Sequence, residues 1–286
     1  MRFWRLIVLF GNLCFSCFAQ STVTNKTPTA EELFFKTMKA IESAKTMTYS
    51  LEMKERINGV IRFDHYNVKL QVKPFKVYSY SHIPNPGAEA IYIEGQNNNK
   101  VLVNPNAFPY MNLNLSPMSM LLRKNHQFGI LQMGFTYTHN VMLNIYVNRK
   151  QEFLQSLKTG DDVYWDKKNC YQLILDYQFF GWIDYKVQKG ETVTTIAEKN
   201  FLNDYMILEK NSLKDYESVR TGQVIKIPNV FCKKYVMYID KVTLLPLVQI
   251  VYDDKGLYSY IEYHNFVLNP TFNEMDFSKD NKAYGF

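Results

Sequence analysis

The segment from Tyr185 to Pro228 constrains the fold more than any other stretch, because it reads as a complete βααβ unit. Residues 185–187 alternate as a short strand, and Thr192 stands where a helix N-cap is expected, followed by apolar residues at helical spacing. A second helix is predicted over about 204–210, and residues 224–227 alternate as a closing strand. Strand-like sequence flanks the unit on both sides, so the rest of the chain is its host.

This segment resembles the LysM domain, a small carbohydrate-binding module, over residues 185–228. The matching residues are, in order, Tyr185, Val187, Gly190-Glu191-Thr192-Val193, Ile196-Ala197, Leu208, Asn211, Gly222-Gln223 and Ile225-Lys226-Ile227-Pro228. One departure is Glu191, where the family usually has Asp, so the charge is kept and the reach is longer.

The resemblance implies a shallow groove between two loops that holds a glycan containing N-acetylglucosamine. Backbone amides near the first helix and the Thr192 hydroxyl would bond an acetamido group, while Val193 and Ile196 would contact its methyl. The residues that the resemblance assigns to the groove are Gly190, Glu191, Thr192, Val193, Ile196, Val219, Arg220, Thr221, Gly222 and Gln223.

Residues 1–19 have the order of a secretory signal peptide: a basic start, an apolar run to Phe18, and the small Ala19 at a cleavage point. The run is short for the alternative, an uncleaved membrane anchor. Lipidation at Cys17 is a further alternative, although the residues before it fit a lipidation site poorly. An exported protein of the periplasm or cell envelope is therefore expected.

The charge balance argues against a nucleic-acid partner. The 286 residues carry a formal charge of +6, and removing the leader with Arg2 and Arg5 lowers it to +4, which is too mild for such binding. No internal apolar run approaches the roughly 18 residues of a transmembrane helix.

Two cysteines, Cys170 and Cys232, remain after the leader is removed, and they flank the LysM-like unit. An exported compartment permits a disulfide between them. If the two flanking strands pair as a hairpin, however, the thiols lie several residues out of register, which is too far for a bridge. Two separate buried thiols are the favoured interpretation, and the bridge is the alternative.

The host reads as a long antiparallel meander with helices at its start and middle. Thr29 and Glu32 form a capping box for an amphipathic helix that runs to about Ala44. A strand then alternates over 47–53, and Asn58-Gly59 is the strongest short hairpin signal. Further strands are predicted at 66–72, 77–78, 90–93, 100–103, 163–165, 170–175, 235–239, 247–252 and 258–263, and helices at 118–123, capped at Ser116-Pro117, and 135–157.

A sheet of this kind curls around helices on its concave side, which predicts an α+β half-open barrel. This is similar to the LolA-like periplasmic lipoprotein carriers and to related envelope proteins. The supporting stretches are Val72-Lys73-Pro74-Phe75-Lys76, Ile93-Glu94-Gly95-Gln96, Ser116-Pro117, Tyr238-Ile239-Asp240-Lys241, Val251-Tyr252-Asp253-Asp254-Lys255-Gly256, Asn269-Pro270 and Phe277. The predicted division is a signal peptide (1–19), a half-barrel in two parts (20–184 and 229–286) and a LysM domain (185–228).

No catalytic or metal-binding motif stands out in the sequence. The five histidines are scattered without an HExxH pair, and neither a GxSxG elbow nor a phosphate-binding glycine loop is present. Cys170 and Cys232 lie on apolar, strand-like sequence, and Asp161-Asp162 reads as turn chemistry. A protein that is not an enzyme, without cofactor or metal, is expected.

The sequence therefore predicts an exported envelope protein that binds peptidoglycan or a chitin-like glycan through its LysM unit, with the half-barrel as scaffold or apolar pocket. The first alternative is a carrier of lipid or lipoprotein, tethered to the wall, with a deep cavity lined by Met47, Tyr49, Leu51 and Leu70. The second is a wall hydrolase, which would need a converging acid, base or metal cluster.

Overall fold

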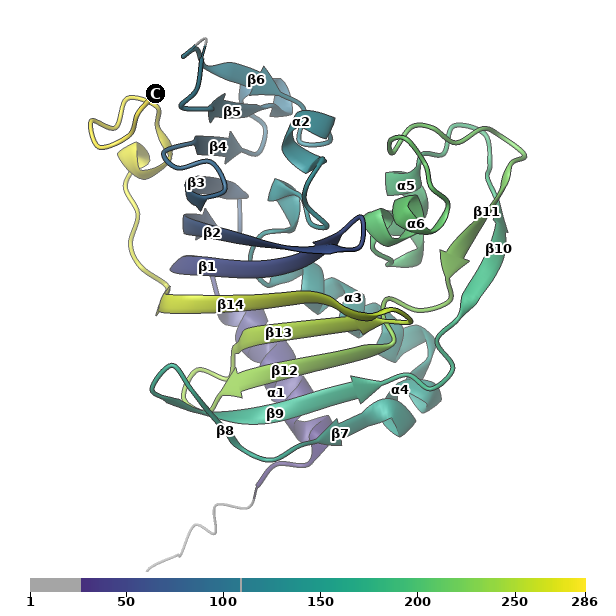
Figure 1. The fold of residues 1–286 in the computed structure, drawn as a ribbon. Coiled ribbons are helices and arrows are strands. Elements are labelled where there is room, and N and C mark those ends of the chain that lie inside the picture. Colours follow the sequence, from purple (N-terminus) through teal and green to yellow (C-terminus); the bar gives the residue numbers. More distant parts are fainter. Residues whose placement is uncertain (1–26, 109) are drawn as a thin grey trace, which may run out of the picture.

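The computed structural model describes residues 27–108 and 110–286, so the predicted leader at 1–19 lies outside the described residues. A large, curved antiparallel sheet forms the host, and helices pack behind it (Figure 1). A smaller unit of two strands and two helices lies to one side of this sheet. The predicted class, α+β with a curved open antiparallel sheet, is confirmed.

Helix α1 (Ala30–Ser43) begins where the capping box predicts. The backbone N–H of Thr29 donates to Glu32 Oε2 at 2.8 Å, and the N–H of Glu32 donates to Thr29 Oγ1 at 3.2 Å. This reciprocal pair satisfies two amides that a helix start leaves free. The buried face of the helix, which includes Leu33 and Phe34, packs into the main core of the host.

The strands that follow α1 form a meander in chain order. They are β1 (Thr46–Ile57), β2 (Val60–Gln71), β3 (Lys76–Ile83), β4 (Glu89–Ile93), β5 (Val101–Asn104) and β6 (Leu113–Leu115), with a 3₁₀ turn η1 (Asn97–Asn99) between β4 and β5. Asn58 has a φ of 51° and Gly59 a φ of 79°, the two positive values that a two-residue type I′ hairpin needs. The predicted hairpin between β1 and β2 is confirmed.

Short helical segments cross the middle of the chain: α2 (Met120–Arg123), the 3₁₀ turn η2 (Ile130–Gln132), α3 (Thr136–Asn148) and α4 (Lys150–Ser156). The prediction that Ser116 caps the first of them is wrong. Ser119 caps it, because its hydroxyl accepts the Leu121 N–H at 3.2 Å. Ser116 belongs to the turn before, where its carbonyl accepts the Ser119 N–H at 2.8 Å.

The second half of the sheet pairs with the first through its last strand. Its strands are β7 (Leu157–Thr159), β8 (Val163–Trp165), β9 (Lys168–Asp176), β12 (Lys234–Asp240), β13 (Pro246–Asp253) and β14 (Gly256–Leu268), and a 3₁₀ turn η3 (Glu274–Phe277) follows. Strand β14 lies against β1, with Met47 opposite Leu268, so an early and a late strand of the chain are neighbours in the middle of the sheet.

The smaller unit interrupts two strands that pair with each other. Strands β9 and β12 are antiparallel neighbours, with Asp176 opposite Lys234 and Cys170 opposite Asp240. Cys232 precedes this register at its other end, and both thiols are free and buried. The expected pair of separate thiols is confirmed.

Apolar side chains from the inner face of the sheet and from α1, α3 and α4 share one large core. In the described part of the chain, no helix has both the length and the apolar character needed to span a membrane.

Candidate functional site

The inserted unit is a closed βααβ fold. Strand β10 (Trp182–Lys186) pairs antiparallel with β11 (Val224–Pro228), and helices α5 (Val193–Asn200) and α6 (Asp204–Lys210) lie between them in the chain. The second helix has the bounds expected from the sequence, whereas β10 begins three residues before Tyr185. The unit has an apolar cluster of its own, whose fully buried members are Val187, Val193, Ile196, Ala197, Leu202, Ile207, Tyr216, Ile225 and Ile227.

The two glycine loops of the predicted groove lie at one end of this small sheet. The Gly222 N–H donates to the Val187 carbonyl at 2.8 Å, and the Val187 N–H donates to the Gln223 carbonyl at 2.9 Å. Gly190 and Gly222 have φ values of +81° and +83°, with open space where a Cβ would stand. Both glycines are therefore required by backbone conformation, which a residue with a side chain adopts only under strain.

Glu191, the departure from the family pattern, is engaged within the unit. Its carboxylate accepts from the Tyr185 hydroxyl at 2.8 and 2.9 Å and from the Gln188 N–H at 2.8 Å, and it lies 3.1 Å from Lys199 Nζ. The Gln188 amide is the main cause that lowers the pKa of Glu191 below its ordinary value, and Tyr185 and Lys199 add to it. Glu191 thus holds the loop in shape.

Thr192 caps α5, as predicted. Its Oγ1 accepts the Thr195 N–H at 3.2 Å, and its own N–H donates to Thr195 Oγ1 at 2.8 Å. The hydroxyl predicted to bond an acetamido group therefore already serves the helix start.

Val193 and Ile196 are each 0% exposed in the core of the unit. The prediction that these two side chains contact a sugar methyl is wrong, because both are buried and neither offers surface to a ligand. Apolar residues at helical spacing show the same sequence pattern whether their face closes a small core or lines a groove. For the other predicted residues, glycan binding stays a prediction.

The groove in this region lies between the inserted unit and the host, with a volume of about 410 Å³. Its lining residues come from α5, from the loop before β11 and from the start of α2: Met118, Ser119, Met120, Thr192, Thr194, Thr195, Glu198, Asp215, Tyr216 and Glu217. Of the residues predicted from the sequence, Thr192 alone is among them. The Val193 N–H donates to the Tyr216 carbonyl at 2.8 Å, which brings the loop against the start of α5.

A buried ion pair joins the host to the inserted unit beside this groove. Arg123 on α2 donates to both carboxylate oxygens of Asp204 on α6, at 2.8 and 2.7 Å, and the two side chains are 2% and 4% exposed. The guanidinium also lies over the Tyr216 ring, 4.0 Å from its centroid. Bidentate pairing fixes orientation as well as distance, so the host wall and the inserted unit are held in one geometry.

Further buried hydrogen bonds tie the two parts together. Asn203, the N-cap of α6, donates to the Gln127 carbonyl at 3.1 Å and accepts from the Tyr258 hydroxyl at 2.7 Å. The Tyr205 hydroxyl accepts the Asn58 N–H at the tip of the β1–β2 hairpin, at 2.9 Å. Every one of these contacts joins the inserted unit to the host.

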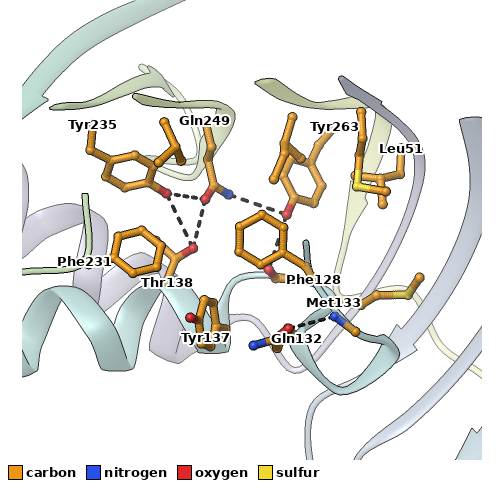
Figure 2. Close-up of a pocket in the computed structure, with 15 residues that line it drawn as sticks. Leu51, Phe128, Gln132, Met133, Tyr137, Thr138, Phe231, Tyr235, Gln249 and Tyr263 are labelled. Atoms are coloured by element: carbon orange, nitrogen blue, oxygen red, sulfur yellow. Dashed lines mark hydrogen bonds between the residues drawn. The ribbon is translucent and has the colours of Figure 1, made fainter. Parts of the chain in front are cut away.

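The half-barrel holds a pocket of about 50 Å³ between the sheet and α3 (Figure 2). Gln249 stands at its centre: its Oε1 accepts from Tyr235 and, at 2.8 Å, from Thr138, and its Nε2 faces the Tyr263 hydroxyl at 3.5 Å. A void of this size holds a water or two rather than an acyl chain.

The deep cavity that a carrier would need is closed in this structure. The side chains expected to line it, Met47, Tyr49, Leu51 and Leu70, are packed in the core at 3% exposure or less.

Neither cysteine has the surroundings of a nucleophile. Burial raises the pKa of the Cys170 thiol to about 11, and the Asp240 carboxylate adds to that rise. Burial also raises the pKa of Cys232. Both thiols therefore stay protonated near neutral pH, and a protonated thiol is a poor nucleophile.

Sequence reasoning missed most of the groove on both sides. Thr194 and Glu198 share one face of α5 at a spacing of four residues, which could have indicated them. Nothing in the sequence points to Met118 and Met120, because only the docking of α2 brings them to the inserted unit.

Two family descriptions match parts of the chain. The LysM domain matches residues 185–228, the bounds expected from the sequence, and a protein family of unknown function, DUF1571, matches residues 44–169. No curated protein matches the chain.

Solved structures similar to this chain cover most of its length at low identity. A LolA superfamily protein from Nitrosomonas europaea is 10% identical, with 89% of this chain and 99% of that chain covered and a TM-score of 0.34. A putative outer membrane lipoprotein-sorting protein domain from Vibrio parahaemolyticus is 11% identical, with 88% and 98% covered and a TM-score of 0.34. The Mycobacterium tuberculosis lipoprotein LppX is 8% identical, with 85% and 97% covered and a TM-score of 0.41.

The LysM resemblance expected from the sequence is found with the same bounds, and the structure shows the expected βααβ order and an apolar cluster within the unit. Residues 185–228 are a LysM domain, inserted between two paired strands of a curved antiparallel sheet.

Proposed function

We propose that this protein is an exported, non-enzymatic protein of the cell envelope that binds a glycan containing N-acetylglucosamine, most simply peptidoglycan. The observation that carries the proposal is the groove of about 410 Å³ between the LysM domain and α2. It has the size of a small-ligand site, and it lies against the α5 start, on the module whose family binds carbohydrate.

The lining of the groove suits an amino sugar. Glu198 offers a carboxylate that can accept from sugar hydroxyls and an acetamido N–H, whereas the Thr194 hydroxyl already donates to Asp204 at 3.0 Å. Met118 and Met120 supply a flexible apolar wall for a sugar face or an acetyl methyl. Polar groups on one side and an apolar wall on the other are the composition expected of a site for a partly apolar sugar ring.

The charge of the groove favours neutral glycans. Glu198, Asp215 and Glu217 lie in its lining. Hydrogen bonding by the Ser218 hydroxyl is the main cause that lowers the pKa of Asp215, so this carboxylate stays ionised near neutral pH. Neutral N-acetylglucosamine segments are therefore expected to bind better than a polyanionic polysaccharide.

The test is calorimetric titration of the protein with chitin oligomers and with soluble peptidoglycan fragments. Met120→Lys places a long charged side chain in the groove from the host side and should weaken binding by about tenfold or more, which is about 1.4 kcal/mol. Leu121→Lys is the matched control, because Leu121 is 77% exposed and is not among the groove residues. It should bind as the wild type does.

The loop site predicted from the sequence is tested in the same series. Thr221→Trp places a bulky group at the exposed loop beside Gly222. Loss of binding in Thr221→Trp with full binding in Met120→Lys would move the site to the two glycine loops. Absence of binding by the wild type to both glycans would overturn the proposal.

The carrier of lipid or lipoprotein is the alternative partner reading, and it requires the half-barrel to open. The glycan is favoured over the lipid because the pocket inside the half-barrel has a volume of only about 50 Å³, whereas the groove at the LysM domain has about 410 Å³.

A further inference from the structure

Two carboxylates and a histidine meet on the inner face of the host sheet, away from the LysM groove. In the β1–β2 hairpin, Asp64 stands opposite Met53, and Glu55 is two residues further along β1. Such diagonal neighbours project from the same face of a sheet within reach of each other. His126, from the segment between α2 and η2, lies over both of them.

The two carboxylates are buried without enough donors. Glu55 is 0% and Asp64 3% exposed. Glu55 Oε1 accepts the Gln127 N–H at 3.1 Å. Within the described residues, the buried oxygens Glu55 Oε2 and Asp64 Oδ2 have no hydrogen-bond partner.

The same two oxygens face one nitrogen. Glu55 Oε2 lies 3.5 Å and Asp64 Oδ2 3.3 Å from His126 Nδ1. That nitrogen carries at most one hydrogen, so it can donate well to one of the two oxygens and leaves the other unsatisfied. An unsatisfied buried charged group is costly, so this cluster calls for a cation that serves all three atoms at once.

We propose that Glu55, Asp64 and His126 bind a divalent transition-metal cation, for which Zn²⁺ is the best fit. Zn²⁺ binds imidazole nitrogen and carboxylate oxygen at about 2.0–2.2 Å in tetrahedral geometry, which puts neighbouring ligand atoms about 3.4 Å apart. The distances from Nδ1 to the two oxygens, 3.3 and 3.5 Å, match that spacing. One ligand atom from each of the three residues lies within 4.8 Å of the others.

The electrostatics of the cluster favour a cation at Nδ1. The buried carboxylates of Glu55 and Asp64 both face this nitrogen. Arg56, the next residue along β1 after Glu55, is engaged by Asp253.

The histidine is held in place by its neighbour. Gln127 Nε2 donates to the backbone carbonyls of Arg56 and Tyr258, each at 3.0 Å. The backbone carbonyl of Gln127 accepts from Asn203 Nδ2. Gln127 is 0% exposed, so the segment that carries His126 cannot drift from the hairpin. Fixed ligands of this kind are what a metal site needs.

The site also has an entrance. The His126 side chain is 22% exposed, whereas the two carboxylate side chains are 0% and 5% exposed. A cation can therefore enter beside the imidazole, and its fourth position is left for water, as in zinc sites with three protein ligands.

A second cluster of similar composition serves as an internal control. Glu52, Glu262 and His264 also lie close enough to share an ion, but all three are only partly buried. Glu262 Oε1 already accepts from Trp165 Nε1 at 2.8 Å and from Tyr260 at 3.3 Å, and His264 Nδ1 faces Asp166 at 3.3 Å. Glu262 and His264 thus have partners, so this cluster has less need of a metal.

The choice of ion follows from the donor set. Imidazole nitrogen suits Zn²⁺, whereas Mg²⁺ and Ca²⁺ take oxygen ligands and higher coordination numbers. Mg²⁺ and Ca²⁺ should therefore bind this site at least about 100-fold more weakly than Zn²⁺.

The test is calorimetric titration of chelator-treated, desalted full-length protein with ZnCl₂ near pH 7. One Zn²⁺ should bind per chain. Asp64→Asn and Glu55→Gln keep the shape and remove a ligand charge. Because loss of groups that only orient a metal ligand costs 10–100-fold, each should weaken binding by about 100-fold or more. Glu262→Gln, in the control cluster, should leave binding unchanged.

Two results would overturn the proposal: no saturable Zn²⁺ binding by the wild type, or binding that survives both ligand variants. Circular dichroism and denaturant midpoints show whether the variants fold. If they do not, the visible spectrum of Co²⁺ added to the wild type decides: tetrahedral absorption that Zn²⁺ abolishes supports the site, and its absence rejects it. Glycan titrations without metal are a separate readout.

Discussion

The LysM domain and the half-barrel enclose their interiors differently. The LysM core is built from residues within 187–227 and leaves a groove of about 410 Å³ at its border with the host. The two halves of the open half-barrel sheet are joined by pairing β1 with β14, strands far apart in the sequence, and its inner pocket is about 50 Å³. The interior of the half-barrel is therefore filled by its own side chains, and space for a ligand lies outside it, in the groove at the junction and in a second groove of about 710 Å³ between strands β3–β6 and η3.

Buried ion pairs and hydrogen bonds also join the two parts at this junction. Arg123 and Asp204 pair across it, and Gln127 and Asn203 extend the network towards the sheet. We infer that the LysM domain is held rigidly against the host and is not joined to it by a flexible linker. The following predictions test this contrast between a fixed junction and a packed interior.

The largest effect is expected from the junction. Asp204→Ala leaves the Arg123 guanidinium buried and unpaired, which should lower the free energy of unfolding by about 3–5 kcal/mol. Denaturant unfolding measures it. Asp184→Ala is the control, because it removes an ion pair with Lys226 whose side chains are 64% and 49% exposed, and it should cost less than about 1 kcal/mol. Equal, small effects in both variants would show that the domain and host are not coupled through this pair.

The packed interior is tested at Gln249, which is 3% exposed. Gln249→Met keeps the volume but leaves the hydroxyls of Tyr235 and Thr138 without their acceptor, which should cost about 1–3 kcal/mol. Gln178→Met, at an exposed position, should change stability by no more than about 0.5 kcal/mol. If Gln249→Met leaves the free energy of unfolding unchanged, the interior admits water or ligand, which would support the lipid-carrier alternative.

A smaller effect is expected at the α5 start. Thr192→Val removes the oxygen that accepts the Thr195 N–H, which should cost about 1 kcal/mol with or without glycan. Thr192→Ser retains a capping hydroxyl and should stay within a few tenths of a kcal/mol of the wild type. If the valine variant is as stable as the wild type but binds glycan less well, the hydroxyl serves the ligand rather than the helix.

The smallest effect is a pH dependence confined to the LysM domain. The pKa of Glu191 is lowered from its ordinary value of 4.5, chiefly by the Gln188 amide. Its stabilisation is therefore present above about pH 4.5 and is lost as the pH falls through the lower folded-state pKa. The difference in unfolding free energy between wild type and Glu191→Gln should shrink between about pH 6 and about pH 3. A difference that stays constant would contradict this.

Local sequence predicted the elements whose signals lie within a few residues. The capping box at Thr29, the Asn58-Gly59 hairpin and the bounds of α6 all agree with the structure. The capping serine of α2 was misplaced from Ser119 to Ser116, because both residues carry the same capping chemistry and only the preceding turn distinguishes them.

The positions of Glu55 and Asp64 in the cluster with His126 could have been predicted from the alternation of their strands. The alternation that puts Met53 on the inner face of β1 puts Glu55 there too, and the alternation of β2 that includes Tyr66 includes Asp64. A carboxylate at an inward position of a strand needs a partner. The position of His126 beside them had no such signal, since it comes from an irregular segment.

By itself, the sequence determined the LysM domain, the curved antiparallel host and the insertion between two paired strands. Those properties depend on short-range periodicity, on turn residues and on a family pattern that is contiguous in the chain. Only the tertiary structure decided that Met118 and Met120 wall the LysM groove, that Val193 and Ile196 are buried, and that Glu55, Asp64 and His126 converge. Contacts of this kind join distant segments, so they depend on how α2 and the hairpin pack, which periodicity does not encode.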